Sequence, residues 1–367
     1  MRPASFLAII VATGICSAIV GLVRLGQIPI GARHLAKHPC LPNEQQTVVQ
    51  LERQVYHPSE LELGWLQKSH HGVICHTSKT QRQAIELWLN YSADIFFKNG
   101  SIRLPSAQEA EVLSSFDWGD DKSYIEPLHG SARSPRICES DVFSLTEPEI
   151  IGIVMDLSFI ITENFCSTLK TPKPRAKFYD LGCVNKAATL NFNWAAYNYT
   201  LGSGRGPSIP LFYSMYKSRC IEFDDIYAWE AEVMEPDLFW HPIPDDVRHK
   251  VRFFNVPVVE NPCPETLSGN FAERGSFLRF LLASASVNDF VVVKVDIDGG
   301  PELEIVEAIA RRPELYELVD ELYFEYHFEF DFNFGWGNMD WQGRTVDTSM
   351  SLMHRLRQVG IRSHFWI

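Results

Sequence analysis

A short apolar run that ends in two carboxylates and two glycines is the feature that most constrains the fold of this chain. Residues 290–295 read Phe-Val-Val-Val-Lys-Val, and Asp296-Ile-Asp298-Gly-Gly follows directly. A β-branched run of this length is typical of a strand buried on both faces of a parallel sheet. Ligands of open α/β sheets bind just beyond the carboxyl ends of such strands. We therefore expect Asp296 and Asp298 to face a ligand or metal, although a helix N-cap followed by a solvated turn acid would leave the same pattern.

The second half of the chain alternates between strand patterns and helix patterns. Such alternation predicts an α/β fold, a doubly wound and mostly parallel sheet. We expect this domain to span residues 171–367. The predicted strands are residues 177–182, 226–229, 251–259, 290–295, 321–325 and 361–367, and the predicted helices are residues 210–217, 277–285, 302–310 and 349–359.

The part of the chain before this domain has a different character. Residues 81–97 and 147–161 have apolar residues at helical spacing, which predicts two helices. Residues 115–136 are acidic and irregular, and we expect a loop there. Residues 59–170 are therefore predicted to form an N-terminal helical region.

The amino terminus predicts a single transmembrane helix. Residues 4–23 are an uninterrupted run of apolar and small residues between Arg2 and Arg24. This length matches the roughly 20 residues that cross a bilayer as a helix. A cleaved signal peptide normally has a shorter apolar region of ~7–15 residues and a clear small-x-small site, so an uncleaved signal anchor over residues 1–26 is the preferred interpretation. The polar, proline-punctuated residues 27–58 are predicted to be a stem.

Glycosylation motifs favour a body on the lumenal side of the membrane. Asn90, Asn99 and Asn198 each begin an Asn-x-Ser/Thr acceptor. Together with the anchor they predict a glycoprotein of the Golgi or another secretory-pathway membrane. The chain has eight cysteines, of which Cys16 lies in the predicted anchor, and the others show no zinc-binding spacing. One or two disulfides fit this pattern, and their pairing is open.

The charge of the chain argues against a nucleic-acid partner. The formal net charge is -13, and lysine and arginine are not clustered anywhere along the sequence. Phosphate backbones are bound by such clusters. The lumenal location instead makes a glycan or a secreted small molecule the expected acceptor.

Carboxylates follow three of the predicted strands, in an order that suits a nucleoside ligand. Asp180 and Gly182 end the first strand, Glu230 follows the second, and Asp296 follows the fourth. In nucleoside-binding α/β folds, a glycine after the first strand lets the backbone approach the ligand, and an acid after the second accepts hydrogen bonds from ribose hydroxyls. Each acid alone could simply cap a turn or a helix. Their coincidence at three strand ends favours the ligand interpretation.

These segments resemble the FkbM-type family of class I S-adenosylmethionine-dependent methyltransferases. The resemblance covers about residues 175–367. The segments that carry it are Tyr179-Asp-Leu-Gly182, Tyr227-Ala-Trp-Glu230, Val293-Lys-Val-Asp-Ile-Asp-Gly299 and Phe324-Glu-Tyr-His327.

The resemblance implies a role for each acid toward the cofactor S-adenosylmethionine. Asp180 and Gly182 would bind its methionine end, and Glu230 would hold the ribose hydroxyls. Asp296 would line the cofactor site next to the point of methyl transfer. The implied chemistry is attack by an acceptor hydroxyl on the sulfonium methyl group.

The catalytic residues implied by the resemblance are Asp298 and His327. His327 would be a base, for which its ordinary pKa is suitable, or a metal ligand. If a divalent metal such as Mg²⁺ or Mn²⁺ takes part, Asp296, Asp298 and His327 would be its ligands. Residues 325–331 alternate acids with aromatics, so His327 could instead belong to a hydrogen-bonded edge strand.

The chain departs from the family pattern after Gly182. The next residues are Cys183-Val-Asn-Lys-Ala, which lack the usual second glycine. The segment between Asp180 and Glu230 is also longer than the ~20 residues of a simple unit. It contains the Gly-rich stretch 201–208 with Arg205, which is either a displaced cofactor loop or a surface loop.

Two other functions remain compatible with the sequence. Asp296-Ile-Asp298 after an apolar strand is also the pattern by which glycosyltransferases hold a divalent metal and a nucleotide-sugar. That interpretation leaves Asp180 and Glu230 without a role. Alternatively, the altered glycine motif would suit a membrane-tethered scaffold that keeps the fold and has lost catalysis.

Overall fold

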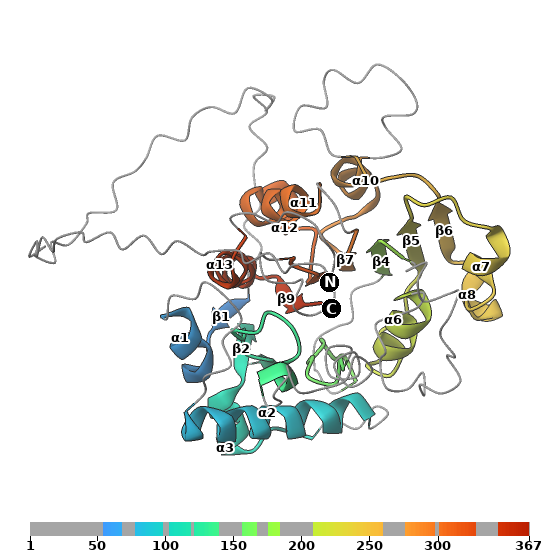
Figure 1. Cartoon of the computed structure of the whole chain (residues 1–367). Coiled ribbons are helices and arrows are strands. Elements are labelled where there is room, and N and C mark those ends of the chain that lie inside the picture. The colour runs from blue at the N-terminus through green and yellow to red at the C-terminus, as the bar shows by residue number, and fades with distance from the viewer. Residues whose placement is uncertain are drawn as a thin grey trace, which may run out of the picture. The chain divides into compact units, whose positions relative to one another are not determined.

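The structure is a computed structural model of the chain (Figure 1). The structure describes residues 54–67, 78–97, 103–118, 121–138, 156–166, 175–183, 208–259, 276–297, 301–327 and 344–366. All of these residues belong to one compact unit, Gln46–Ile367. The predicted anchor, residues 1–26, lies outside the described residues, as does Asp298. Among the described residues, no helix is long and apolar enough to cross a membrane.

A six-stranded sheet forms the centre of this unit, and its strand order is β6-β5-β4-β7-β8-β9. Every neighbouring pair is parallel, which confirms the predicted α/β class. All residues of β7 are buried, as its β-branched sequence predicts. The chain builds outward from β4 to β6 and then returns to the other side of β4 with β7. The strands are β4 (Arg175–Leu181), β5 (Asp225–Trp229), β6 (Val251–Phe254), β7 (Asp289–Val295), β8 (Glu321–Phe324) and β9 (Arg362–Phe365).

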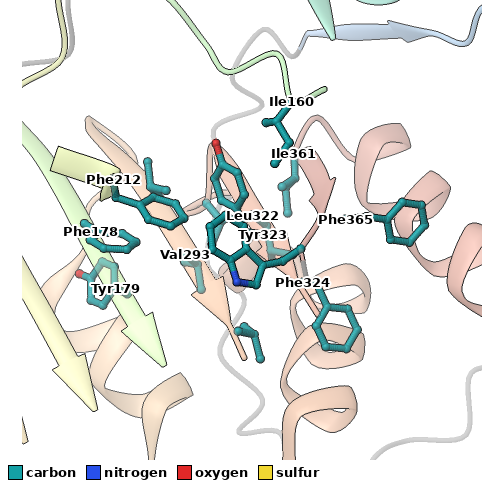
Figure 2. Packing of buried hydrophobic residues seen from close by; sticks show 14 of the residues in the cluster. Ile160, Phe178, Tyr179, Phe212, Val293, Leu322, Tyr323, Phe324, Ile361 and Phe365 are labelled. Carbon is teal, nitrogen blue, oxygen red and sulfur yellow. The ribbon is translucent and has the colours of Figure 1, made fainter. Parts of the chain in front are cut away.

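Helices cover both faces of the sheet, because successive side chains of a strand point to opposite faces. Phe178 of β4 stacks on Phe212 of α6, with ring centroids 4.5 Å apart (Figure 2). Its neighbour Tyr179 meets Phe277 of α10 edge to face at 5.9 Å. The helices of this part are α6 (Ser208–Lys217), α7 (Pro236–Trp240), α8 (Asp245–Arg248), α10 (Phe277–Ser284), α11 (Pro301–Arg311), α12 (Pro313–Tyr316) and α13 (Val346–Gln358).

The N-terminal region contains a second sheet, so the prediction that it is helical is only partly right. Strands β1, β2 and β3 form a three-stranded antiparallel sheet. The predicted loop at 115–136 is therefore wrong, because its first part forms β2 and β3. Of the predicted helix 147–161, the described residues 156–161 form a single turn and no helix. The elements are β1 (Val55–His57), α1 (Glu60–Leu66), α2 (Lys79–Phe97), α3 (Ala107–Val112), β2 (Ser114–Trp118), β3 (Asp121–Ile125) and η1 (Pro135–Cys138).

Local capping explains where several helices begin. The Ser59 hydroxyl accepts the first-turn N–H of Glu62 at the start of α1. A capping box begins α3, where Ser106 and Glu109 each accept the other's backbone N–H. Such caps satisfy N–H groups that have no partner within the helix.

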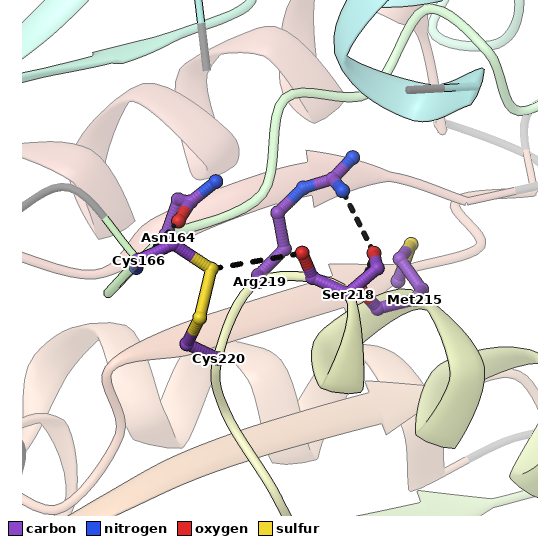
Figure 3. Close-up of a disulfide and its surroundings, with 6 residues drawn as sticks. All are labelled: Asn164, Cys166, Met215, Ser218, Arg219 and Cys220. Atoms are coloured by element: carbon purple, nitrogen blue, oxygen red, sulfur yellow. Dashed lines mark hydrogen bonds between the residues drawn. A yellow bond between two sulfur atoms is a disulfide. The ribbon is translucent and has the colours of Figure 1, made fainter. Parts of the chain in front are cut away.

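A disulfide links Cys166, which precedes β4, to Cys220, which follows α6 (Figure 3). The Cys166 sulfur also lies 3.7 Å from the carbonyl oxygen of Ser218. Cys183 is buried and carries a free thiol. The sequence allowed this pairing without specifying it. Disulfides are typical of oxidising compartments.

Candidate functional site

The predicted site residues of the described chain lie at one edge of the sheet. Asp180, Glu230 and Asp296 stand at the carboxyl ends of the neighbouring strands β4, β5 and β7. The backbone holds these ends together, because the Asp296 N–H donates to Leu181 at 3.0 Å. The strand order reverses between β4 and β7, and ligands of open α/β sheets bind at such a reversal.

Gly182 lets the backbone leave β4 at this point. Its φ of +83° lies in the left-handed region, and a Cβ there would lie 1.4 Å from the carbonyl oxygen of Asp296. Only glycine fits both conditions. Its N–H donates to the Trp229 carbonyl of β5 at 3.1 Å, so this glycine links the ends of three strands.

Asp180 is fully buried and is only partly hydrogen-bonded. Its Oδ1 accepts from the Ser208 hydroxyl at 3.2 Å and lies 3.4 Å from Lys294 Nζ. Its Oδ2 has no hydrogen-bond partner among the described residues. Burial raises the pKa of Asp180 to about 6, against the effect of Lys294. A buried carboxylate oxygen without a partner is costly, which makes it a candidate ligand contact.

Lys294 connects the two acids on either side of the strand reversal. Its Nζ lies 2.8 Å from Asp296 Oδ2 and donates to the Gly182 carbonyl at 2.8 Å. Burial opposes its charge, but Asp296 and Asp180 raise the pKa of Lys294. The sequence motif contained this lysine, yet its role as the shared counter-ion was not predicted.

Asp296 belongs to a buried hydrogen-bonded chain rather than to an open surface. Trp366 Nε1 donates to its Oδ2 at 3.2 Å. Burial raises the pKa of Asp296 well above its ordinary value despite Lys294, and the charge of Glu325 adds to the rise. Burial alone would raise the pKa of Glu325 too, but hydrogen bonds from His327 and Asp296 hold it below its ordinary range.

His327 is buried just beyond the end of β8. Its Nε2 lies 3.5 Å from Glu325 Oε2. Glu325 thus stands between Asp296 and His327. β8 ends at Phe324 and His327 itself lies outside any strand, so the alternative placement of His327 in an edge strand does not hold.

Glu230 lies at the end of β5, and part of its hydrogen-bonding capacity is used locally. Its Oε1 accepts the N–H of Glu232 at 3.0 Å. Its carbonyl oxygen accepts from the side chain of Asn255 at 2.9 Å. The alternative that this acid simply caps a turn therefore accounts for its contact with the N–H of Glu232. Its charge also acts on Asp180, whose pKa it helps to raise.

Sequence reasoning missed an arginine that comes from the N-terminal region. Arg133 Nη1 donates to the Trp366 carbonyl at 2.8 Å, and Nη2 lies 3.8 Å from Glu325. Both partners belong to the site, while Arg133 follows β3. Its position in an irregular segment gave no signal for this role.

Glu302, at the start of α11, is a further residue to which the sequence interpretation assigned no role. It is fully buried, and its Oε1 lies 3.0 Å from Arg344 Nη1. Burial raises the pKa of Glu302 to about 7, against the effect of His327. Its Oε2 has no hydrogen-bond partner among the described residues.

The predicted metal ligands are not brought together in the described part of the chain. Those residues contain no group of three or more histidine, cysteine or acidic side chains that could hold a metal ion. Asp298, the central residue of the predicted set, lies outside them. So does the Gly-rich stretch up to residue 207, whereas Ser208 begins α6 and contacts Asp180.

Comparison with protein-family models, with curated proteins and with solved structures gave no match to this chain. The function therefore has to be argued from the geometry of the site.

Proposed function

We propose that the chain is a membrane-anchored S-adenosylmethionine-dependent methyltransferase that methylates a hydroxyl of a glycan or small molecule in the secretory pathway. The observation that carries the proposal is Asp180. It is a fully buried carboxylate, one oxygen of which has no hydrogen-bond partner among the described residues, and it lies next to Gly182, where the strand order reverses. This is where an α/β sheet of this order receives a nucleoside ligand.

The residues at this edge fit the polar groups of the cofactor. Asp180 Oδ2 would accept from the methionine ammonium, and Glu230 would accept from the ribose hydroxyls. When bound, the cofactor supplies a methyl group on a sulfonium. Asp298 and His327 would orient the acceptor hydroxyl and take up its proton.

The contacts of Asp296 favour this proposal over a metal-dependent glycosyltransferase. A metal ligand needs a free carboxylate lone pair, whereas Asp296 Oδ2 already faces Lys294 at 2.8 Å and Trp366 at 3.2 Å. The same contacts suggest that Asp296 supports the site through Lys294 and Trp366.

The secretory location rests on separate observations. The Cys166–Cys220 disulfide is typical of an oxidising compartment. Asn90 of α2, in one of the three predicted glycosylation motifs, is exposed. The apolar run of residues 4–23 would supply the anchor.

The proposal is tested by calorimetric titration of S-adenosylhomocysteine into the full chain and three variants. We expect saturable binding to the wild type, and a loss of about 10- to 100-fold or more in Asp180→Asn and Glu230→Ala, because hydrogen bonds to charged groups contribute about 1.5–3 kcal/mol. Asp289→Asn is the matched control. Asp289 is also a buried acid paired with a lysine, Lys177, at 2.7 Å, but it lies at the opposite edge of the sheet. This variant should bind normally.

A stability measurement separates lost binding from lost folding. Because burial raises the pKa of Asp180 from 3.8 to about 6, its contribution to stability is retained below about pH 4 and is lost as the pH rises through about 6. An asparagine side chain cannot ionise, so the Asp180→Asn variant avoids the cost of burying a charged carboxylate. Its free energy of unfolding relative to the wild type should therefore be up to about 3 kcal/mol higher near pH 7 than at pH 4, at 1.36 kcal/mol per pKa unit. Denaturant unfolding at both pH values measures the gain.

The outcomes separate the three functions. Absence of binding to the well-folded wild type would contradict the methyltransferase proposal. Binding of a nucleotide-sugar with Mn²⁺ would then select the glycosyltransferase, and binding of neither ligand the scaffold. Normal binding by Glu230→Ala would show that the ribose site is misplaced.

A further inference from the structure

His364 lies between two glutamates that come from different parts of the fold. It belongs to β9, and its Nδ1 lies 2.7 Å from Oε1 of Glu126, which follows β3 of the N-terminal region. Its Nε2 lies 2.7 Å from Oε1 of Glu321, the first residue of β8. All three side chains are buried. The imidazole therefore joins the N-terminal region to the large sheet.

The two distances favour a charged ring. A neutral imidazole has a single N–H, so beside two ionised carboxylates one of its nitrogens would direct a lone pair at a carboxylate oxygen. Between two ionised glutamates, only the imidazolium donates to both. Burial opposes this charge, but Glu126 and Glu321 together raise the pKa of His364. Burial would also raise the pKa of Glu321, but the hydrogen bond from His364 helps to lower it.

The surrounding charges favour this cation. Four buried glutamates are ion-paired to two buried arginines and to His364, so without the histidine proton these glutamates and arginines carry a net charge of -2. The buried guanidinium of Arg219 also interacts electrostatically with Glu321 and offsets part of this charge. Tyr216 of α6 donates to Glu321 Oε2 at 2.7 Å, and the Tyr323 ring of β8 stacks on His364 with centroids 4.5 Å apart. The charged and titratable groups of the network are Tyr56, Glu62, Glu126, Glu163, Tyr216, Arg219, Glu321, Tyr323, His354, Arg357, Arg362 and His364.

The network continues into the candidate site through β9. Trp366 lies two residues after His364, and its indole donates to Asp296 Oδ2. Arg133, from the same N-terminal segment as Glu126, holds the Trp366 carbonyl. A shift of β9 relative to the N-terminal region would therefore move a direct partner of Asp296.

We propose that His364 is a positioning residue that carries a positive charge between Glu126 and Glu321, and that loss of its proton at alkaline pH loosens the N-terminal region from β9 and, through Trp366, the candidate site. A group whose pKa is raised by folding stabilises the fold fully below its ordinary pKa, here 6.5. That contribution is lost as the pH rises through the raised value. In an acidic secretory lumen His364 would stay protonated and the N-terminal region would stay attached to β9.

The charge of His364 is tested on the full chain by nitrogen NMR of selectively labelled histidines between about pH 6 and about pH 8.5. The chain has 12 histidines, and the expectation concerns two of them. His364 should stay doubly protonated well above pH 6.5. His129 is the internal control, because burial lowers its pKa to about 3, so it should stay neutral. A spectrum in which no histidine remains charged above about pH 7.5 would overturn the proposal.

The positioning role is tested by melting temperature against pH. The wild type should lose several degrees between about pH 6 and about pH 9, and His364→Gln, which cannot carry the charge, should be lower at pH 6 and change less. His249→Gln, at an exposed histidine, should follow the wild type. Equal pH slopes for wild type and His364→Gln would contradict the proposal, and if His364→Gln does not fold, Glu126→Gln, which removes one carboxylate, should move the titration of His364 to lower pH.

The link to the site rests on the proposed function and has its own readout. The affinity for S-adenosylhomocysteine should fall several-fold with rising pH in the wild type and stay flat in His364→Gln. A charged His364 with no ligand binding at any pH would overturn the proposed function and leave the contact itself established. Binding that is independent of pH would reject only the link between His364 and the candidate site.

Discussion

At the scale of single residues, Gly182 combines a backbone requirement with a steric one. Its φ is +83°, and a Cβ would lie 1.4 Å from the Asp296 carbonyl oxygen, so β4 or β7 would have to move. We expect Gly182→Ala to lower the free energy of unfolding by about 3 kcal/mol or more, the sum of left-handed strain and overpacking. Denaturant unfolding measures the loss.

Gly360 supplies the matched control for this substitution. Its φ is +93°, yet no atom of the described residues lies within 4 Å of a Cβ placed there. Gly360→Ala should therefore cost only the backbone strain, about 1–2 kcal/mol. Equal losses in the two variants would show that the contact with Asp296 relaxes without cost.

Site residues were predictable from sequence where they end a strand. Asp180, Gly182 and Asp296 follow runs whose burial pattern is visible in the sequence, and parallel pairing places these ends along one edge. Arg133 and Trp366 reach the same place through tertiary packing from opposite ends of the fold. No local pattern encodes such contacts, so sequence reasoning missed them.

At the scale of elements, the buried strands were predicted far better than the short N-terminal sheet. Strands β4, β5, β7, β8 and β9 all overlap the predicted ranges, and the apolar runs of β5 and β7 are typical of buried strands. The predicted strand 251–259 ends early, at Phe254. β2 and β3 were read as loop because their polar sequences, SSFDW and DKSYI, resemble irregular structure. Their stability comes from pairing with each other and with β1.

The disulfide gives a prediction at this scale, because it ties the segment before β4 to the end of α6. Cys166 and Cys220 are 54 residues apart in sequence. Closing a loop of this length in the unfolded chain corresponds to about 4 kcal/mol in the chain-entropy description. Cys166→Ser/Cys220→Ser should lose up to this amount of unfolding free energy, measured by urea unfolding.

A reduction experiment provides the control for the paired serine variant. Dithiothreitol should lower the melting temperature of the wild type, because it reduces the Cys166–Cys220 disulfide. The Cys166→Ser/Cys220→Ser protein lacks this disulfide, so its melting temperature should not fall for this reason. The buried thiol of Cys183 should contribute nothing to the difference. If the wild type were insensitive to reductant while its thiols reacted fully, the link would not stabilise the fold.

At the scale of the whole molecule, the N-terminal region and the large sheet share buried charges as well as apolar packing. Arg357 of α13 has no exposed surface, and neither has Glu62 of α1, 3.1 Å away. The same guanidinium donates to the carbonyl of Glu126 at 2.8 Å and to that of Ser363 at 2.8 Å. Two regions joined in this way should unfold together. The sequence gives no signal for this, since buried charges are visible only once their partners are known.

Arg357→Met tests this coupling. It leaves the Glu62 carboxylate buried without its cation, and breaking a buried pair in this way costs about 3–5 kcal/mol. In the wild type, burial raises the pKa of Glu62, but the charge of Arg357 and the hydrogen bonds to the carboxylate lower it below its ordinary value. Without Arg357, the pKa of Glu62 should therefore rise. Unfolding followed by far-ultraviolet circular dichroism and tryptophan fluorescence should show one transition at lower denaturant.

Two further variants isolate the pair from the general loss of an arginine. Arg357→Met/Glu62→Gln removes both charges and should recover part of the loss, since no unpaired carboxylate remains. Arg311→Met breaks the exposed pair with Glu307 and should change stability by no more than about 0.5 kcal/mol. The double variant could instead be no more stable than Arg357→Met. The lost stability would then come from the hydrogen bonds of Arg357 to the Glu126 and Ser363 carbonyls. In that case the connection between the two regions would depend on backbone contacts rather than on charge.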